Sequence, residues 1–332
     1  MRAVSFALWR LCQTVRRATD YDAHLPHAAM TDRTNASELR ALLALFAGAL
    51  AIGSSGIFVR LSETGPTATA FWRGAFALPF LALWAWLERR AAHAPRSSLR
   101  EPLFIWAGVF FAGDLLLWHW SLLLTSIAAS TLEANCAPIL VTLLAWFLWG
   151  ERPKPAFLFA TALAFGGMLL ILAPKLGAGA HALLGDALGL GTACFYGGYI
   201  IVVARLRTHH GTGIVMLTST AVFTLLLLPL ALLQKFMPVT AHGWWLLVGC
   251  AISAQVLGQG LIAYALAHLS ATFGAVGLYV QVIAAAVYAW LLLGERLAPL
   301  QVLGAVVVLL AIAFAHSARR AATPSRVNAS AA

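Results

Sequence analysis

The residues best suited to chemistry in this sequence are the few ionisable side chains inside long apolar runs. Asp114 lies near the middle of one run, with Trp118 four residues later and His119 beside it. A charged carboxylate at that depth of a bilayer costs about 3 kcal/mol on insertion scales, so it faces the protein interior or carries a proton. Residues four apart share a helix face. We predict that Asp114 or His119 contacts a solute or exchanges a proton; the alternative is a carboxylate paired with a neighbouring helix for packing alone.

A second group lies in the next apolar run. Glu133 and Asn135 stand about two turns inside its start, and Pro138 follows. Because proline has no N–H to donate, it frees a backbone carbonyl of the helix. Transporters bind solutes at interrupted helices of this kind near the bilayer midplane. The pattern favours a functional role for Glu133 over a carboxylate that snorkels to the membrane surface, and Asn135 is a further candidate for which a structural role is favoured.

Amide and aromatic side chains supply the polar candidates of the later runs. Gln255 and Gln259 are four residues apart and should share a helix face, where they can bind solute or hydrogen-bond another helix. Tyr279 and Gln281 are two residues apart, so only one of them can face a central cavity. Arg73 can meet an anionic solute, although a structural role as counter-charge to a carboxylate or a helix end is favoured.

Composition places these residues in a membrane protein. Hydrophobic residues make up 61% of the 332 residues and charged residues 10%, whereas soluble domains carry about a quarter charged residues. The net charge of +10 does not predict nucleic-acid binding, because Lys and Arg lie in short segments between apolar runs. The four cysteines show no CxxC spacing, so neither a zinc site nor a disulfide framework is predicted, and no feature calls for a cofactor.

The chain from residue 39 onward consists of apolar runs near the roughly 20 residues that a bilayer span needs. We predict an all-α membrane protein with ten transmembrane helices at 39–60, 67–87, 102–122, 127–149, 156–174, 183–204, 213–233, 243–266, 271–293 and 299–316. Segment 1–38 is predicted to be a cytoplasmic extension that is disordered, or the product of a mis-assigned start with Met30 as the true one. Segment 317–332 is predicted to be a cytoplasmic tail.

An internal repeat divides these helices into two sets. The sequence WFLWGERPKP at 146–155 returns 144 residues later as WLLLGERLAP at 290–299. A repeat of that length indicates two related halves, which we place at 39–174 and 183–316 with a linker at 175–182. Each half holds five spans, an odd number, so the second half is predicted to be inverted relative to the first, as in many transporters.

Charged residues between the runs predict the orientation of the chain. Lys and Arg are concentrated on the side of the N-terminus, which places both termini in the cytoplasm of a multi-pass protein. The charged residues of the two GER turns are predicted to cap and staple turns rather than to touch solute; they are Glu151, Arg152, Glu295 and Arg296.

These features resemble the drug/metabolite transporter superfamily, of the EamA type. The resemblance covers 39–316 and rests on the five-plus-five spans, the paired GER turns, Gly65-Pro66 ahead of Arg73, and Gly53-Ser54-Ser55-Gly56. It implies a bacterial inner-membrane protein that moves amino acids, metabolites or drugs. It also implies a central cavity lined mainly by helices 1, 3, 4, 6, 8 and 9, without identifying the solute.

We therefore expect a secondary transporter that moves a small solute, by export, through alternating access of the two halves about a midplane cavity. Proton exchange at Glu133 or Asp114 is one source of drive, and facilitated exchange is the other. The alternative class is an intramembrane enzyme acting on a lipid-soluble substrate. The spans contain no HExxH or GxSxG motif, so the transporter is favoured.

Overall fold

The computed structural model describes residues 35–90, 101–137, 155–172, 180–207, 209–266 and 271–320, and all regular structure in these ranges is helical. The chain from Ala41 to Ala332 forms one unit, to which the packing below refers. The helices are α2 (Asn35–Gly53), α3 (Ser55–Leu61), α4 (Pro66–Arg90), α5 (Leu103–Leu124), α6 (Ile127–Ala134), α8 (Pro155–Leu172), α9 (Ala180–Leu206), α10 (Thr212–Leu232), α11 (Ala241–Cys250), the π-helix η3 (Ala251–Gln259), α12 (Gly260–Leu266), α13 (Ala271–Leu293) and α14 (Pro299–Arg320).

Membrane-spanning stretches account for most of this structure. Six stretches in the described part are long and apolar enough to cross a bilayer: Leu39–Leu61, Pro66–Arg90, Leu103–Leu124, Ala180–Val203, Thr212–Leu232 and Ala241–Ala265. Shorter apolar helices cover Val280–Leu293 and Pro299–Ala311. The prediction of a helical membrane protein is therefore confirmed for the described residues. The count of ten spans stays a prediction, and residues 138–154, which hold the first GER turn, lie outside the described residues.

Two predicted helices are interrupted in ways that the apolar pattern did not indicate. The first breaks at Ser54, between α2 and α3, where the Ser54 hydroxyl donates to the carbonyl of Ala51 and lies 2.7 Å from the hydroxyl of Ser253. The stretch predicted at 243–266 contains the π-helix η3 between two α-helices. π-Helical turns are rare and often mark functional sites, and this one carries both Gln255 and Gln259.

The fourth predicted helix, 127–149, is described only at its start. Helix α6 ends at Ala134, Asn135 is its C-cap, and the description stops at Ala137. The early end agrees with the sequence, because Pro138 has no N–H to donate to the carbonyl of Ala134.

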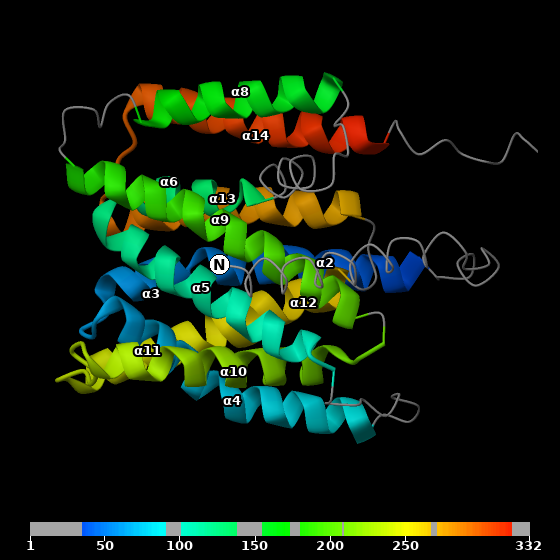
Figure 1. Cartoon of the computed structure of the whole chain (residues 1–332), viewed down its shortest axis with the longest axis vertical. Helices are drawn as coiled ribbons and strands as arrows, with labels where there is room; N and C mark the ends of the chain where they lie inside the picture. The colour runs from blue at the N-terminus through cyan, green and yellow to red at the C-terminus, as the bar shows by residue number, and fades with distance from the viewer. Residues whose placement is uncertain are drawn as a thin grey trace, which may run out of the picture. The chain divides into compact units, whose positions relative to one another are not determined.

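Helix pairs from the two parts of the chain pack on each other. Helix α4 packs against α10, and α8 against α14, at opposite ends of the row of helices, with α5 and α9 packed together between them (Figure 1). A glycine on each of α5 and α9 leaves room for an aromatic ring of the other helix. A Cβ on Gly113 would lie 2.3 Å from the Phe195 ring, and one on Gly198 would lie 2.6 Å from the Phe110 ring. Small residues permit this approach in membranes, where apolar burial gives helices little reason to associate.

Several helix N-termini are capped by side chains from the other half of the chain. The Glu88 carboxylate accepts hydrogen bonds from the N–H groups of Thr212 (2.8 Å) and Gly213 (2.7 Å) at the start of α10. The Glu295 carboxylate accepts one from Ile127 N–H (3.1 Å) at the start of α6. A carboxylate at a helix N-terminus satisfies free N–H groups and complements the helix dipole. The predicted capping role of the second GER turn is therefore confirmed for Glu295.

Candidate functional site

A polar cavity lies where the membrane-spanning helices of the two halves meet. Its wall is formed by α2, α3, α4, α5, the end of α6, α9, η3 and α13, through Ile52, Ser55, Arg73, Asp114, Leu115, Trp118, Ala134, Asn135, Tyr196, Gln259 and Gln281. The family resemblance implies a cavity lined by helices 1, 3, 4, 6, 8 and 9. The cavity in this structure uses all six of these helices and adds α4, through Arg73.

The cavity is small in this conformation. The space open to a water-sized sphere is about 30 Å³. One water molecule needs roughly 10–15 Å³ by this measure, whereas sites for drug-sized ligands span about 300–1,000 Å³. A few water molecules would fill the site as it stands, so a larger ligand requires the surrounding helices to move apart.

Arg73 provides the fixed positive charge of the cavity. Its side chain is only 2% exposed, and its Nε–H donates to Gln255 Oε1 at 3.1 Å. The other end of that amide donates from Nε2 to the Thr220 hydroxyl at 3.0 Å. The guanidinium carbon lies 5.8 Å from the centre of the Phe111 ring, within range of a cation–π contact. These neighbours fix Arg73 in one orientation, and its Nη groups donate no hydrogen bond to the described residues.

Asp114 places a carboxyl group on the same cavity. It lies on α5, is 7% exposed, and forms no direct ion pair with Arg73 in the described part of the chain. Trp118, one turn later, lines the cavity too, as the predicted shared face requires. The cavity wall does not include His119. That imidazole is fully buried, its Nδ1–H donates to the carbonyl of Leu115 at 2.8 Å, and its Nε2 has no hydrogen-bond partner among the described residues.

Amide and hydroxyl groups on the cavity wall lack partners within the described residues. Asn135 Nδ2 donates to the carbonyl of Thr131 at 2.7 Å, which fixes the amide orientation and leaves Oδ1 buried without a hydrogen bond. Ser55 Oγ and Gln281 Oε1 are likewise buried without a partner. Because buried polar atoms are almost always hydrogen-bonded, these atoms indicate a site that is completed by water or by a ligand.

Three further candidates lie elsewhere or outside the description. Glu133 is fully buried but faces α9, where a Cβ on Gly189 would lie 2.1 Å from its Oε2, and it is not part of the cavity wall. Gln255 supports Arg73 instead of lining the cavity. Tyr279 belongs to α13, but its side chain is outside the described residues. Its partner in the alternating pair, Gln281, lines the cavity.

The repeat register relates residues of the cavity wall across the two halves, and these include Tyr196, which its residue type alone did not identify. Tyr196 and Ile52 are 144 residues apart, and so are Gln259 and Leu115. All four line the cavity. The offset that relates the two GER turns therefore also relates positions across the site, so Tyr196 could have been selected by its match to the apolar end of the first helix. Ser55 had no such signal.

Comparisons with known proteins agree with this architecture. The model of the EamA-like transporter family matches residues 39–173 and 183–316. The Pseudopaline exporter CntI of two Pseudomonas aeruginosa strains is 27% identical over 271 residues, which cover 81% of this chain and 93% of the relative. A solved structure described as "Crystal structure of protein" superposes with a TM-score of 0.60 at 17% identity, covering 85% of this chain and 99% of its own, and supports the fold alone. The chain is a multi-pass membrane transporter and not an enzyme, and it belongs to the EamA-like transporter family.

Proposed function

We propose that this protein exports a small solute across a bacterial inner membrane, and that the solute binds in the polar cavity. The observation that carries the proposal is a set of buried polar atoms around one cavity, from both halves of the chain, that have no hydrogen-bond partner among the described residues; Asn135 Oδ1 and Gln281 Oε1 belong to this set. Intramembrane polar groups are expensive, and their common use is a solute or ion pathway. The export direction is taken from the relative, which is named as an exporter.

The transport cycle that fits this site is alternating access between two inverted five-helix halves with both termini in the cytoplasm. The wall pairs related by 144 residues, Ile52 with Tyr196 and Leu115 with Gln259, support this symmetry. The small volume of the cavity supports a cycle in which the described conformation is nearly closed and the halves separate to admit the solute.

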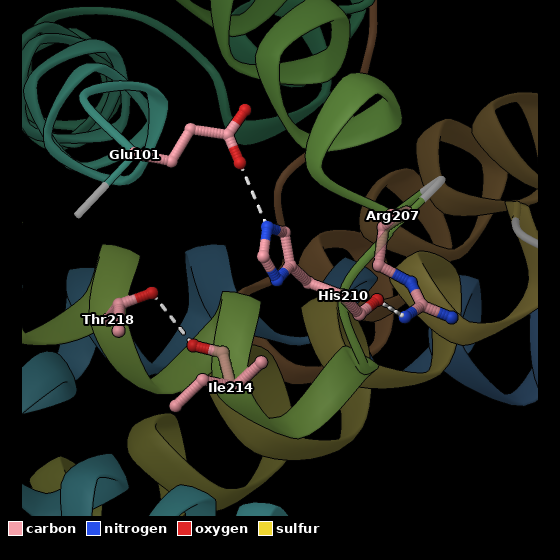
Figure 2. A network of polar contacts seen from close by, with 5 residues as sticks. All are labelled: Glu101, Arg207, His210, Ile214 and Thr218. Atoms are coloured by element: carbon pink, nitrogen blue, oxygen red, sulfur yellow. Dashed lines mark hydrogen bonds and ion pairs between the residues drawn. The ribbon is translucent and has the colours of Figure 1, made fainter. Parts of the chain in front are cut away.

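We assign the gates to two contacts that join the halves, Thr125 with Asp186 and Glu101 with His210, each next to a further hydrogen bond within one half. At the end where α6 begins, Arg60 Nη2 donates to the carbonyl of Thr125 at 2.8 Å, and the Thr125 hydroxyl donates to Asp186 Oδ1 at 2.6 Å. At the end where α10 begins, His210 Nε2 lies 2.8 Å from Glu101 Oε2, while Arg207 donates to the carbonyl of His210 (Figure 2). Alternating access predicts that one set opens while the other stays closed.

We place any proton coupling at Asp114. A carboxylate in the same cavity as the solute can release its proton when the solute binds and take one up when the solute leaves. The two events are linked because a proton on the carboxylate changes the charge that the solute meets. Glu133 faces α9 instead, so it is the second choice. If Glu133→Gln and Asp114→Asn both keep full flux driven by a pH gradient in vesicles, coupling at these sites is wrong.

Metabolite profiling of cells tests the proposed function. Expression of the wild-type protein should raise at least one small compound in the medium and lower it inside the cells, compared with an empty vector. Arg73→Gln and Asp114→Asn should abolish the difference while reaching the membrane in normal amount. Arg89→Gln, which neutralises an exposed arginine at the end of α4, is the matched control and should behave as wild type. A wild-type profile identical to that of the vector would contradict export.

A further inference from the structure

Two segments from different halves of the chain, residues 62–72 and 234–240, are joined at the end of the bundle where α4 begins. We call this contact the seam. The amide of Gln234 binds Thr67 twice: its Oε1 accepts from the backbone N–H at 3.0 Å, and its Nε2 donates to the hydroxyl at 2.9 Å. A paired amide of this kind fixes both partners, so the seam holds the start of α4 against the loop between α10 and α11.

Main chain and aromatic rings reinforce the seam. The backbone N–H of Gly65 donates to the carbonyl of Lys235 at 2.9 Å, and a Cβ on Gly65 would lie only 2.7 Å from the Cβ of Gln234. Trp72 Nε1–H donates to the carbonyl of Phe236 at 2.7 Å, and the two rings lie 5.2 Å apart. A solute would pass here only if the main-chain bond, the amide pair and the aromatic contact all broke together.

The contact continues from the seam along the whole of α4 and α10. Near the middle, a Cβ on Gly74 would collide with the hydroxyl of Thr224, so the two helices lie as close as their backbones allow. At the far end, the carboxylate of Glu88 accepts from the N–H of Thr212 at 2.8 Å. Helices α4 and α10 are therefore fastened at both ends and in the middle, although they come from different halves.

A weaker contact between the halves lies at the same end of the bundle. Trp120 on the last turn of α5 donates to the Thr67 hydroxyl at 3.2 Å, which places the end of α5 beside the seam. Beyond it, the Thr125 hydroxyl donates to Asp186 on α9. Breaking such a bond has a modest net cost, because water hydrates the carboxylate that is released. Gly185 meets the end of α5 without a side chain of its own, so the surfaces do not interlock there.

We propose that the seam stays closed in every state of the transport cycle, and that the solute leaves the cavity between α6 and α9, past Thr125 and Asp186. This inference rests on the proposed alternating access. The free energy of opening is lower at the Thr125–Asp186 contact than at the seam, so the halves separate on that side and turn about the other. Helices α5, α6 and α9 also form part of the cavity wall, so this opening reaches the cavity directly.

Two cysteine pairs of matched geometry test the inference. Gly65→Cys with Gln234→Cys spans the seam, and Leu124→Cys with Gly185→Cys spans the proposed exit. A Cβ built on each glycine lies 2.7 Å and 2.8 Å, respectively, from the Cβ of its partner. A disulfide needs about 3.8 Å, so both pairs require a similar small shift. Each pair is introduced into a protein without the native cysteines that carries Ser55→Cys as the reporter.

The readout is the rate at which an impermeant maleimide labels Ser55→Cys from each side of the membrane. Oxidation of the seam pair should leave both rates as they are in the reduced protein. Oxidation of the exit pair should slow labelling from the side where α4 begins by at least about tenfold, because the state open to that side is no longer populated. Labelling from the opposite side should persist, and reduction should restore the lost rate.

The outcomes separate this inference from the function on which it rests. If the seam disulfide slows labelling from either side, or the exit disulfide slows neither rate, the inference is wrong and alternating access stands. If the reporter alone is not labelled from both sides, alternating access fails and the inference fails with it. If the seam pair does not fold, a bifunctional maleimide across Glu63→Cys and Thr240→Cys, whose native side chains are hydrogen-bonded, locks the same seam and carries the same prediction.

Discussion

Gln255 accepts a hydrogen bond of 3.1 Å from Arg73 Nε, although 182 residues separate the two along the chain. The contact joins α4 in the first half to the π-helix η3 in the second, and the same amide is anchored to Thr220 on α10. The one buried arginine of the cavity wall is therefore oriented by a residue that does not itself line the cavity. Gln255 is a positioning residue for the charge on which the proposed site depends.

Gln255→Leu should raise the KM for the exported compound with little change in maximal rate. The substitution removes an acceptor from a charged donor, an interaction worth about 1.5–3 kcal/mol, which corresponds to roughly a ten- to hundredfold weaker site. Initial rates in everted vesicles give both parameters. Gln301→Leu removes a glutamine whose amide oxygen accepts from Ala298 N–H outside this cavity, so its KM should match wild type. An unchanged KM in Gln255→Leu would argue against the positioning role.

Gly189→Ala should destabilise the protein by about 1–3 kcal/mol, the usual effect of overpacking. The new Cβ would lie 2.1 Å from Glu133 Oε2 and 3.1 Å from Glu133 Cβ, so α6 and α9 must separate or the Glu133 side chain must leave its position. Gly166→Ala on α8 is the control, because no atom lies within 4 Å of the added Cβ. Thermal unfolding of the two purified variants should differ clearly. Equal midpoints would show that the packing at Gly189 is looser than described.

Glu63 should make stability depend on pH at the loop between α3 and α4. Its pKa is lowered, first by the hydrogen bond from the Thr240 hydroxyl and then by those from the N–H groups of Thr240 and Val239. A lowered pKa in the folded protein means that the carboxylate stabilises fully above the unfolded value, about 4.5, and that this stability is lost as pH falls through the lowered value.

Glu63→Gln should therefore lower the melting temperature at pH 7, and the difference from wild type should shrink below pH 4.5. Lys235→Gln, which removes an exposed charge from the α10–α11 loop, should have a smaller effect, because the hydrogen bonds to Thr240 and Val239 remain. Melting curves at a series of pH values would decide the matter. A difference that persists unchanged at low pH would assign the effect to something other than the ionised carboxylate.

Thr125→Val should shift the proposed gate near the start of α6 toward its open state. The change removes the 2.6 Å hydrogen bond from the Thr125 hydroxyl to Asp186 and leaves the carbonyl that accepts from Arg60. A hydrogen bond to a charged group is worth about 1.5–3 kcal/mol, so the open population should rise about tenfold or more. Reactivity of a cavity cysteine toward an impermeant reagent added on that side measures the shift. If the cysteine reacts at the wild-type rate, the hydrogen bond between Thr125 and Asp186 does not hold the gate closed.

The sequence predicts which polar residues lie inside the membrane better than it predicts which of them face the cavity. The spacing of Asp114 and Trp118 places both on the cavity, and Gln281 lines it too, while the side chain of Tyr279 lies outside the described residues. Glu133 carries the same sequence signal as Asp114, an acid in an apolar run. Only the packing of α6 against α9, at Gly189, turns Glu133 away from the cavity.

Helix interruptions were also beyond the sequence pattern. The apolar runs of the sequence continue through Ser54 and through η3. Hydropathy indicates which segments lie in lipid, but it does not indicate which backbone N–H bonds to which carbonyl within the helix. The side-chain hydroxyl of Ser54, which bonds to Ala51 and Ser253, depends on a neighbour 199 residues away. Contacts of that range are set by tertiary packing, so local patterning cannot foresee them.

Accessibility of Ser55→Cys tests the central claim most directly. Ser55 lines the cavity, and Ser219 on α10 does not; both are 0% exposed, and the Ser219 hydroxyl donates to the carbonyl of Val215. In a background with the native cysteines replaced, each variant is treated with an impermeant thiol reagent in right-side-out and in inside-out vesicles. The account predicts that Ser55→Cys reacts from both sides, with protection by the exported compound, while Ser219→Cys reacts from neither. Reaction of Ser55→Cys from one side only, or from neither, would contradict an alternately exposed cavity.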